Sequence, residues 1–85
     1  MHKKISIEQS KISDGINFVE NGLTELKIAK KQRIKTMLVA EEALVKLTEH
    51  AESQDDQIGI SLNKNLNRIY VNMTLRGQEF QLIQG

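Results

Sequence analysis

Cysteine and proline are both absent from this chain of 85 residues. Without cysteine the chain has no disulfide bonds, no thiolate metal ligands and no cysteine nucleophile. The aromatic residues are Phe18, Tyr70 and Phe80, too few for the row of rings on which single-stranded nucleic acids stack. The net charge of +1 gives no general attraction to nucleic acid. We therefore expect no nucleic-acid partner.

Long hydrophobic runs are missing as well. No apolar stretch approaches the roughly 20 residues that span a bilayer, and the N-terminal stretch MHKKISIEQSK has no apolar signal core. We therefore expect a cytoplasmic protein. Because a chain this short makes at most one domain, residues 1–85 are expected to form a single domain, either alone or as the N-terminal module of a larger protein.

Three stretches alternate apolar and polar residues, which predicts strands with one buried face. They are residues 3–7, 58–63 and 69–75. The asparagine-rich segment 64–67 predicts a turn that joins the last two strands into a hairpin. The tail, RGQEFQLIQG, begins with a turn at Gly77 and is expected to supply hydrophobic contacts from Phe80, Leu82 and Ile83.

Apolar residues spaced three and four apart predict two helices. The first covers residues 12–26 and is expected to be capped by Ser10 or Ser13. Gly15 and Gly22 weaken this helix by roughly 1 kcal/mol each relative to alanine; either they permit close approach of a neighbouring element, or packing alone holds the helix. The second helix, Ile34–Ala51, has a wide apolar stripe, as expected for contact with a sheet and another helix.

The element order β-α-α-β-β predicts an α+β fold, a two-layer sandwich. Both helices are expected on one face of a small, largely antiparallel sheet of three strands. The other face would meet solvent or a second copy, and the polar residues expected there are Ser6, Ser61, Tyr70, Asn72 and Thr74.

A basic cluster lies in the predicted connection between the helices. It has two interpretations: a docking surface for an acidic partner or an anionic lipid, or a solvated connection. The charge pattern alone is typical of the second. The cluster consists of Lys27, Lys30, Lys31, Arg33 and Lys35.

The second helix carries the residues with candidate chemistry. Glu41 projects from the apolar stripe. It is either a functional group, as a buried acid or base with a raised pKa or as a nucleotide contact, or a glutamate at the stripe edge that reaches solvent. Glu42, Lys46 and His50 follow one another at i,i+4 spacing. Taken alone, this predicts a helical ion pair and a histidine at the negative end of the helix dipole.

The motif on this helix, Glu42-Ala43 followed by His50, and the hairpin that ends in LRGQEF resemble the first half of the GHKL family of histidine-kinase-like ATPases. The likeness is greatest to the bacterial anti-sigma-factor serine kinases, whose helix carries E-A-x-x-N-x-x-x-H and whose hairpin runs into D-x-G-x-G. The resemblance implies an ATP and magnesium site in which Glu42, Lys46 and Gly77 are the matching nucleotide-binding positions.

Two departures from that pattern imply that the site is degenerate. Lys46 replaces the asparagine that holds magnesium, and an ammonium group has no lone pair to offer a metal. Leu75 and Arg76 stand where the family has the aspartate that reads adenine. The family's lid and later glycine box are also missing from this sequence.

The resemblance therefore implies a non-catalytic regulatory or protein-interaction domain without a cofactor, similar to the cytoplasmic modules of bacterial cation:dicarboxylate symporter-type proteins. In that setting the basic cluster faces anionic lipid. Two alternatives stay open. The chain is a fragment of an active serine kinase that binds ATP with magnesium, or it is a small homodimeric binding protein unrelated to nucleotide, whose sheet edges need cover.

Overall fold

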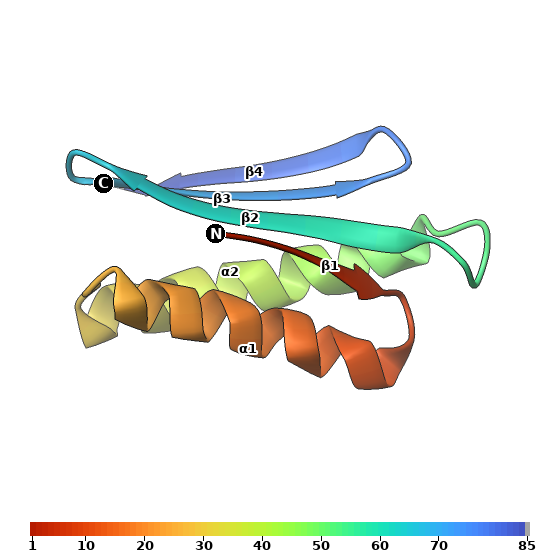
Figure 1. Ribbon diagram of the computed structural model, residues 1–85, viewed down its shortest axis with the longest axis horizontal. Coiled ribbons are helices and arrows are strands. Elements are labelled where there is room, and N and C mark those ends of the chain that lie inside the picture. The colour runs from red at the N-terminus through yellow and green to blue at the C-terminus, as the bar shows by residue number, and fades with distance from the viewer. Residues whose placement is uncertain (85) are drawn as a thin grey trace.

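The computed structural model describes residues 1–84 as two layers, a sheet and a pair of helices (Figure 1). The sheet is antiparallel throughout, with strand order β1-β2-β3-β4, and both helices lie on one of its faces. The predicted α+β two-layer sandwich is confirmed. In chain order the elements are β1 (His2–Ser6), α1 (Gln9–Glu25), α2 (Lys30–Glu49), β2 (Gln57–Asn65), β3 (Arg68–Leu75) and β4 (Gln78–Gln84).

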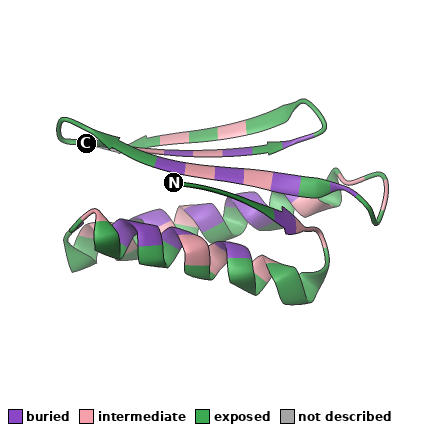
Figure 2. Cartoon of the chain, viewed as in Figure 1, coloured by how far each residue is buried: buried purple, intermediate pink, exposed green. Residues whose placement is uncertain are grey.

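The hydrophobic core fills the space between the two layers (Figure 2). Alternate residues of β2 and β3 point into it. Ile60 lies opposite Met73 and Leu62 lies opposite Val71 in the antiparallel register, and all four side chains are buried. This alternation is what makes one face of each strand apolar. The helices contribute Val19, Leu23, Ala40, Ala43, Leu44 and Leu47.

The tail after Gly77 forms a fourth strand, which the sequence analysis did not predict. Residues 78–84 pair with β3 along its length, and Phe80 and Leu82 lie opposite Met73 and Val71. The turn was predicted correctly, and Phe80 and Leu82 pack against the core as expected. The expected hydrophobic contact of Ile83 was wrong, because this residue is 50% exposed on the opposite face of the sheet. Adjacent apolar residues Leu82 and Ile83 break the alternation that marks a strand, so the pattern was concealed.

The opposite face of the sheet is polar, as predicted. Ser61 and Asn72 face each other across β2 and β3, and Tyr70 lies opposite Ile83 on β4. Neither Ser6 on β1 nor any of the three predicted polar residues of β3 is buried. The helices therefore cover one face and leave this one open.

The start of α1 differs from the prediction. The helix begins at Gln9, and Glu8 occupies the N-cap position without a side-chain hydrogen bond to the helix. Both serines that were expected to cap, Ser10 and Ser13, lie inside the helix, so that prediction was wrong. Instead the Ser6 hydroxyl oxygen accepts a hydrogen bond from the Glu8 backbone N–H at 3.1 Å.

The end of α1 is a Schellman motif built on a lysine. The Ile28 N–H donates to the Leu23 carbonyl at 3.1 Å and the Lys27 N–H donates to the Thr24 carbonyl at 3.0 Å. Lys27 adopts a left-handed φ of 60°, a conformation that usually requires glycine. Ile28 and Leu23 are both buried, which adds the hydrophobic contact that accompanies this motif.

The close approach of α1 to the sheet depends on its two glycines. A Cβ at Gly15 would lie 2.8 Å from Ile5 Cδ1, and one at Gly22 would overlap Leu62 Cδ2. The first interpretation of these glycines is therefore confirmed. Close packing places α1 against β1 and β2 and leaves α2 beneath β3.

Candidate functional site

The three motif residues of α2 lie on one ridge of the helix. Lys46 Nζ lies 3.5 Å from Glu42 Oε1, and both side chains are about 70% exposed. His50 is the C-cap residue, and its backbone N–H donates to the Leu47 carbonyl at 3.0 Å. The predicted i,i+4 ion pair is therefore present. An exposed pair of this kind stabilises a helix by only a few tenths of a kcal/mol.

Gly77 belongs to the tight turn that joins β3 to β4. Its φ is 81°, and that of Arg76 is 46°, so both central residues are left-handed, as in the two-residue turns that suit the twist of a hairpin. The chain then continues directly as β4. This turn brings the start of β4 beside the ridge of motif residues, although the two segments are far apart in sequence.

A groove of about 370 Å³ lies between the ridge of α2 and the start of β4. It combines apolar side chains with the ion pair of Glu42 and Lys46, a second acid, Glu79, and one histidine. Lys46 carries a charge that can contact an anion without ligating a metal. The lining residues are Val39, Glu42, Ala43, Lys46, Leu47, His50, Gln78, Glu79 and Phe80.

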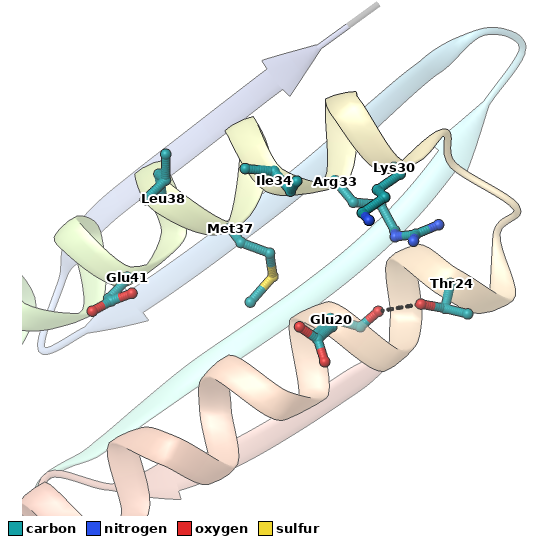
Figure 3. Close-up of a pocket in the computed structure, with 8 residues that line it drawn as sticks. All are labelled: Glu20, Thr24, Lys30, Arg33, Ile34, Met37, Leu38 and Glu41. Atoms are coloured by element: carbon teal, nitrogen blue, oxygen red, sulfur yellow. Dashed lines mark hydrogen bonds between the residues drawn. The ribbon is translucent and has the colours of Figure 1, made fainter.

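A second groove, of about 420 Å³, runs between the two helices on their outer side (Figure 3). Figure 3 shows the Met37 side chain directed toward α1, and the Thr24 hydroxyl donating to the Glu20 carbonyl at 3.0 Å. Leu38 lies at the outer rim on α2 and is 64% exposed. The groove continues along the helices past Ile12, Ile16 and Val45.

Glu41 lies where these two segments of the helix–helix groove meet. Its side chain is exposed, which agrees with the interpretation of a glutamate at the edge of the apolar stripe that reaches solvent. The alternative, a buried acid or base, does not fit this position.

The basic cluster is mostly helical, because α2 begins at Lys30 and not at Ile34 as predicted. Lys30, Lys31 and Arg33 therefore occupy its first turn, where the helix dipole disfavours positive charge. Arg33 folds back, and its guanidinium donates to the Ile28 carbonyl at 2.8 Å. Lys27, in contrast, belongs to the connection before the helix.

A buried acid, Asp56, links two loops of the fold. Asp56 is 8% exposed, and its Oδ1 accepts a hydrogen bond of 2.6 Å from Arg76 Nε. Its Oδ2 accepts bonds from the backbone N–H groups of Glu52 and Ser53, at 2.8 and 3.2 Å. The guanidinium also lies 3.5 Å from the Glu52 carboxylate.

The bond from Arg76 is the main reason that the pKa of Asp56 falls from 3.8 to about 2. The two backbone donors lower this pKa further, and burial opposes them. The same pairing raises the pKa of Arg76. Arg76 thus holds the α2–β2 loop to the β3–β4 turn, at the position where the resemblance expected an adenine-reading aspartate.

Within residues 1–84, no three His, Asp or Glu side chains are grouped so that they could hold a metal ion. In the same part of the chain, neither helix is both long enough and apolar enough to cross a membrane. Comparison with protein-family models, with curated proteins and with solved structures finds no match for this chain.

Proposed function

We propose that this chain is a non-catalytic protein-interaction module whose contact surface is the outward face of α2. The observation that carries the proposal is the exposure of three apolar residues there. Ile34, Leu38 and Val45 are 51%, 64% and 48% exposed, and spacings of four and seven place them along one line of the helix. Large exposed apolar side chains gathered on one face of a helix are typical of a protein-binding surface.

The proposal includes descent from a GHKL-type ATPase that has lost its nucleotide. The two departures from the family pattern support the loss of nucleotide binding. Lys46 is an ammonium paired with Glu42, and Arg76 is engaged by Asp56 and Glu52. The chain also continues after Gly77 as a strand paired along β3. On this account, neither ATP nor magnesium is a cofactor.

The setting that we propose is a bacterial cytoplasmic protein in which this domain regulates a partner or a larger parent chain, as in the symporter-type modules. The absence of cysteine supports this location, because small secreted domains commonly rely on disulfides. The basic first turn of α2 supports an additional peripheral contact with an acidic surface.

Isothermal titration calorimetry with Mg-ATP tests the loss of nucleotide binding. We expect no saturable heat in the millimolar range. The variant Lys46→Asn should not bind either, because it restores the metal ligand without restoring the aspartate that would read adenine. Saturable binding of Mg-ATP at micromolar concentration would overturn the proposal and favour the kinase fragment.

A further inference from the structure

The charges of α2 run against its own helix dipole. Its N-terminal half carries Lys30, Lys31, Arg33 and Lys35, and its first turn has no acidic residue. Its C-terminal half carries three acids, Glu41, Glu42 and Glu49, and one base, Lys46. The helix dipole favours the reverse order, with acids first and bases last. Apart from Lys46, whose place in the last turn suits the dipole, the charges of α2 break this local rule, which indicates that they are placed for another purpose.

The outward face of α2 also has the spacing of a coiled-coil seam. Six positions follow one another at alternating steps of four and three, the repeat that keeps one line of side chains facing a partner helix. Every one of them is exposed. These six residues, the seam of α2, are Lys31, Lys35, Leu38, Glu42, Val45 and Glu49.

We propose that two copies of this chain associate through α2 in antiparallel orientation, with Leu38 of each copy at the twofold axis. This deepens the proposed function by naming the partner for the outward face of α2, and it does not depend on the loss of nucleotide binding. An interface of this kind is isologous, so every contact away from the twofold axis occurs twice.

The charge order of the seam is what selects this partner. A twofold axis at Leu38 brings Lys35 of one copy beside Glu42 of the second copy and places Lys31 between Glu42 and Glu49 of that copy. The charges that oppose the dipole within one helix then meet opposite charges on the other. Antiparallel alignment also places each helix N-terminus beside the C-terminus of its neighbour.

The binding free energy would come from the apolar members of the seam, with Ile34 beside them. Leu38, the most exposed of these residues, lies at the centre of the contact, where buried residues contribute most. Exposed ion pairs contribute little to affinity, so here they set orientation and register. A face one helix wide is small for a stable complex, and we expect a micromolar dissociation constant.

An anionic membrane fits the same face less well. Lipid phosphates would attract Lys31 and Lys35, but a helix lying flat would also bring Glu42 and Glu49 to the surface, where like charges repel. An acidic peptide meets the same difficulty. Only a partner with the reversed charge order pairs both the lysines and the glutamates of the seam with opposite charges. A second copy in antiparallel orientation has that order.

Sedimentation velocity over a concentration series tests the association. We expect the 85-residue chain to shift from monomer to dimer, and Leu38→Glu to weaken dimerisation by at least tenfold. Leu66→Glu is the matched control, since Leu66 is 88% exposed and lies in the β2–β3 turn away from α2. A wild-type chain that stays monomeric at several hundred micromolar would overturn the proposal, as would equal effects of the two variants.

A charge swap tests the orientation. Lys35→Glu and Glu42→Lys should each weaken dimerisation by roughly threefold to tenfold, as expected for two exposed ion pairs made or lost together. The double variant should recover most of the wild-type affinity. Additive losses in the double variant would contradict the antiparallel pairing.

Cysteine cross-linking fixes the register, because the wild-type chain has no cysteine. Under mild oxidation Leu38→Cys should give a linked dimer. Lys31→Cys should not link to itself, since its two copies lie about 20 Å apart along the helices, but it should link to Val45→Cys in a mixture. Efficient self-linking of Lys31→Cys would indicate parallel helices and overturn the model.

Flotation with phosphatidylserine vesicles tests whether an anionic membrane, and not a second copy of the chain, binds the outward face of α2. A chain that is monomeric in solution, yet binds vesicles and loses that binding in Leu38→Glu, would assign the face to a membrane and overturn the homodimer. Neither dimerisation nor vesicle binding changes the result expected from calorimetry with Mg-ATP. Failure of the dimer is therefore distinguishable from failure of the proposed loss of nucleotide binding.

Discussion

At the scale of single residues, Asp56 is the titrating group that matters most to the fold. Its pKa in the folded chain, about 2, lies below its ordinary value of 3.8. The unfolded state therefore binds a proton more readily than the folded state as the pH falls. The stabilisation is fully present above about pH 4 and is lost as the pH falls toward 2.

Asp56→Asn should lower the free energy of unfolding at pH 7, because it removes the charge that Arg76 and two backbone N–H groups bind. Urea denaturation from pH 7 to pH 2 measures this. The difference from wild type should shrink between pH 4 and pH 2. Asp55→Asn, at an exposed neighbour, is the control and should have little effect. A difference for Asp56→Asn that is constant with pH would contradict the account.

Among Gly15, Gly22, Gly59 and Gly77, Gly22 is the glycine at which an added Cβ would come closest to a neighbouring atom. Gly22→Ala gains about 1 kcal/mol of helix propensity, but its Cβ would overlap the fully buried Leu62. Overpacking of a core typically costs about 1–3 kcal/mol, so we expect a net loss of roughly 1 kcal/mol in thermal or urea unfolding. Asn21→Ala, exposed in the same turn, should instead be neutral or slightly stabilising. A stabilised Gly22→Ala would show that α1 is not held tightly to the sheet.

At the scale of elements, the end of α1 offers a test of its capping. Lys27→Gly should raise the free energy of unfolding by about 1 kcal/mol, because glycine adopts the left-handed φ of this position without steric cost. Lys35→Gly makes the same chemical change in the interior of α2, where glycine should lower stability by about 1 kcal/mol. Urea denaturation of both variants measures the contrast, and loss of stability in Lys27→Gly would contradict the Schellman cap.

The elements that could be predicted from sequence are those with an unbroken period. Strands β2 and β3 alternate cleanly, and the core stripes of both helices follow steps of three and four. The start of α2 was placed four residues late, because its first turn is basic and lacks the serine, threonine or acidic residues that usually mark a helix N-terminus. Strand β4 was missed because Ile83, on the open face, follows Leu82 directly.

The candidate site could be predicted only within α2. The pair of Glu42 and Lys46 follows from i,i+4 spacing, since helix geometry is local. The groove beside it depends on β4, and the bond between Asp56 and Arg76 joins residues 20 positions apart through two loops. Contacts of that kind are set by sheet register, which a local pattern does not reveal.

At the scale of the whole molecule, the two layers leave two large surfaces uncovered, and their chemistry differs. The open face of the sheet is mostly polar, with Ile83 as an exposed apolar residue near its edge, so water can solvate most of it. The outward face of α2 combines half-exposed apolar side chains with a charge order that its own helix disfavours. This contrast is why the account assigns binding to the helical layer and not to the sheet.

Two-dimensional ¹⁵N–¹H NMR spectra of the chain over a dilution series test this assignment most directly. The account predicts concentration-dependent shifts that follow one binding curve and concentrate on residues 31–49, strongest around Leu38, with β4 and the open sheet face unchanged. Shifts confined to residues 78–84 would place the contact at the sheet edge, and spectra independent of concentration would show that α2 does not bind a second copy; either result would contradict the account.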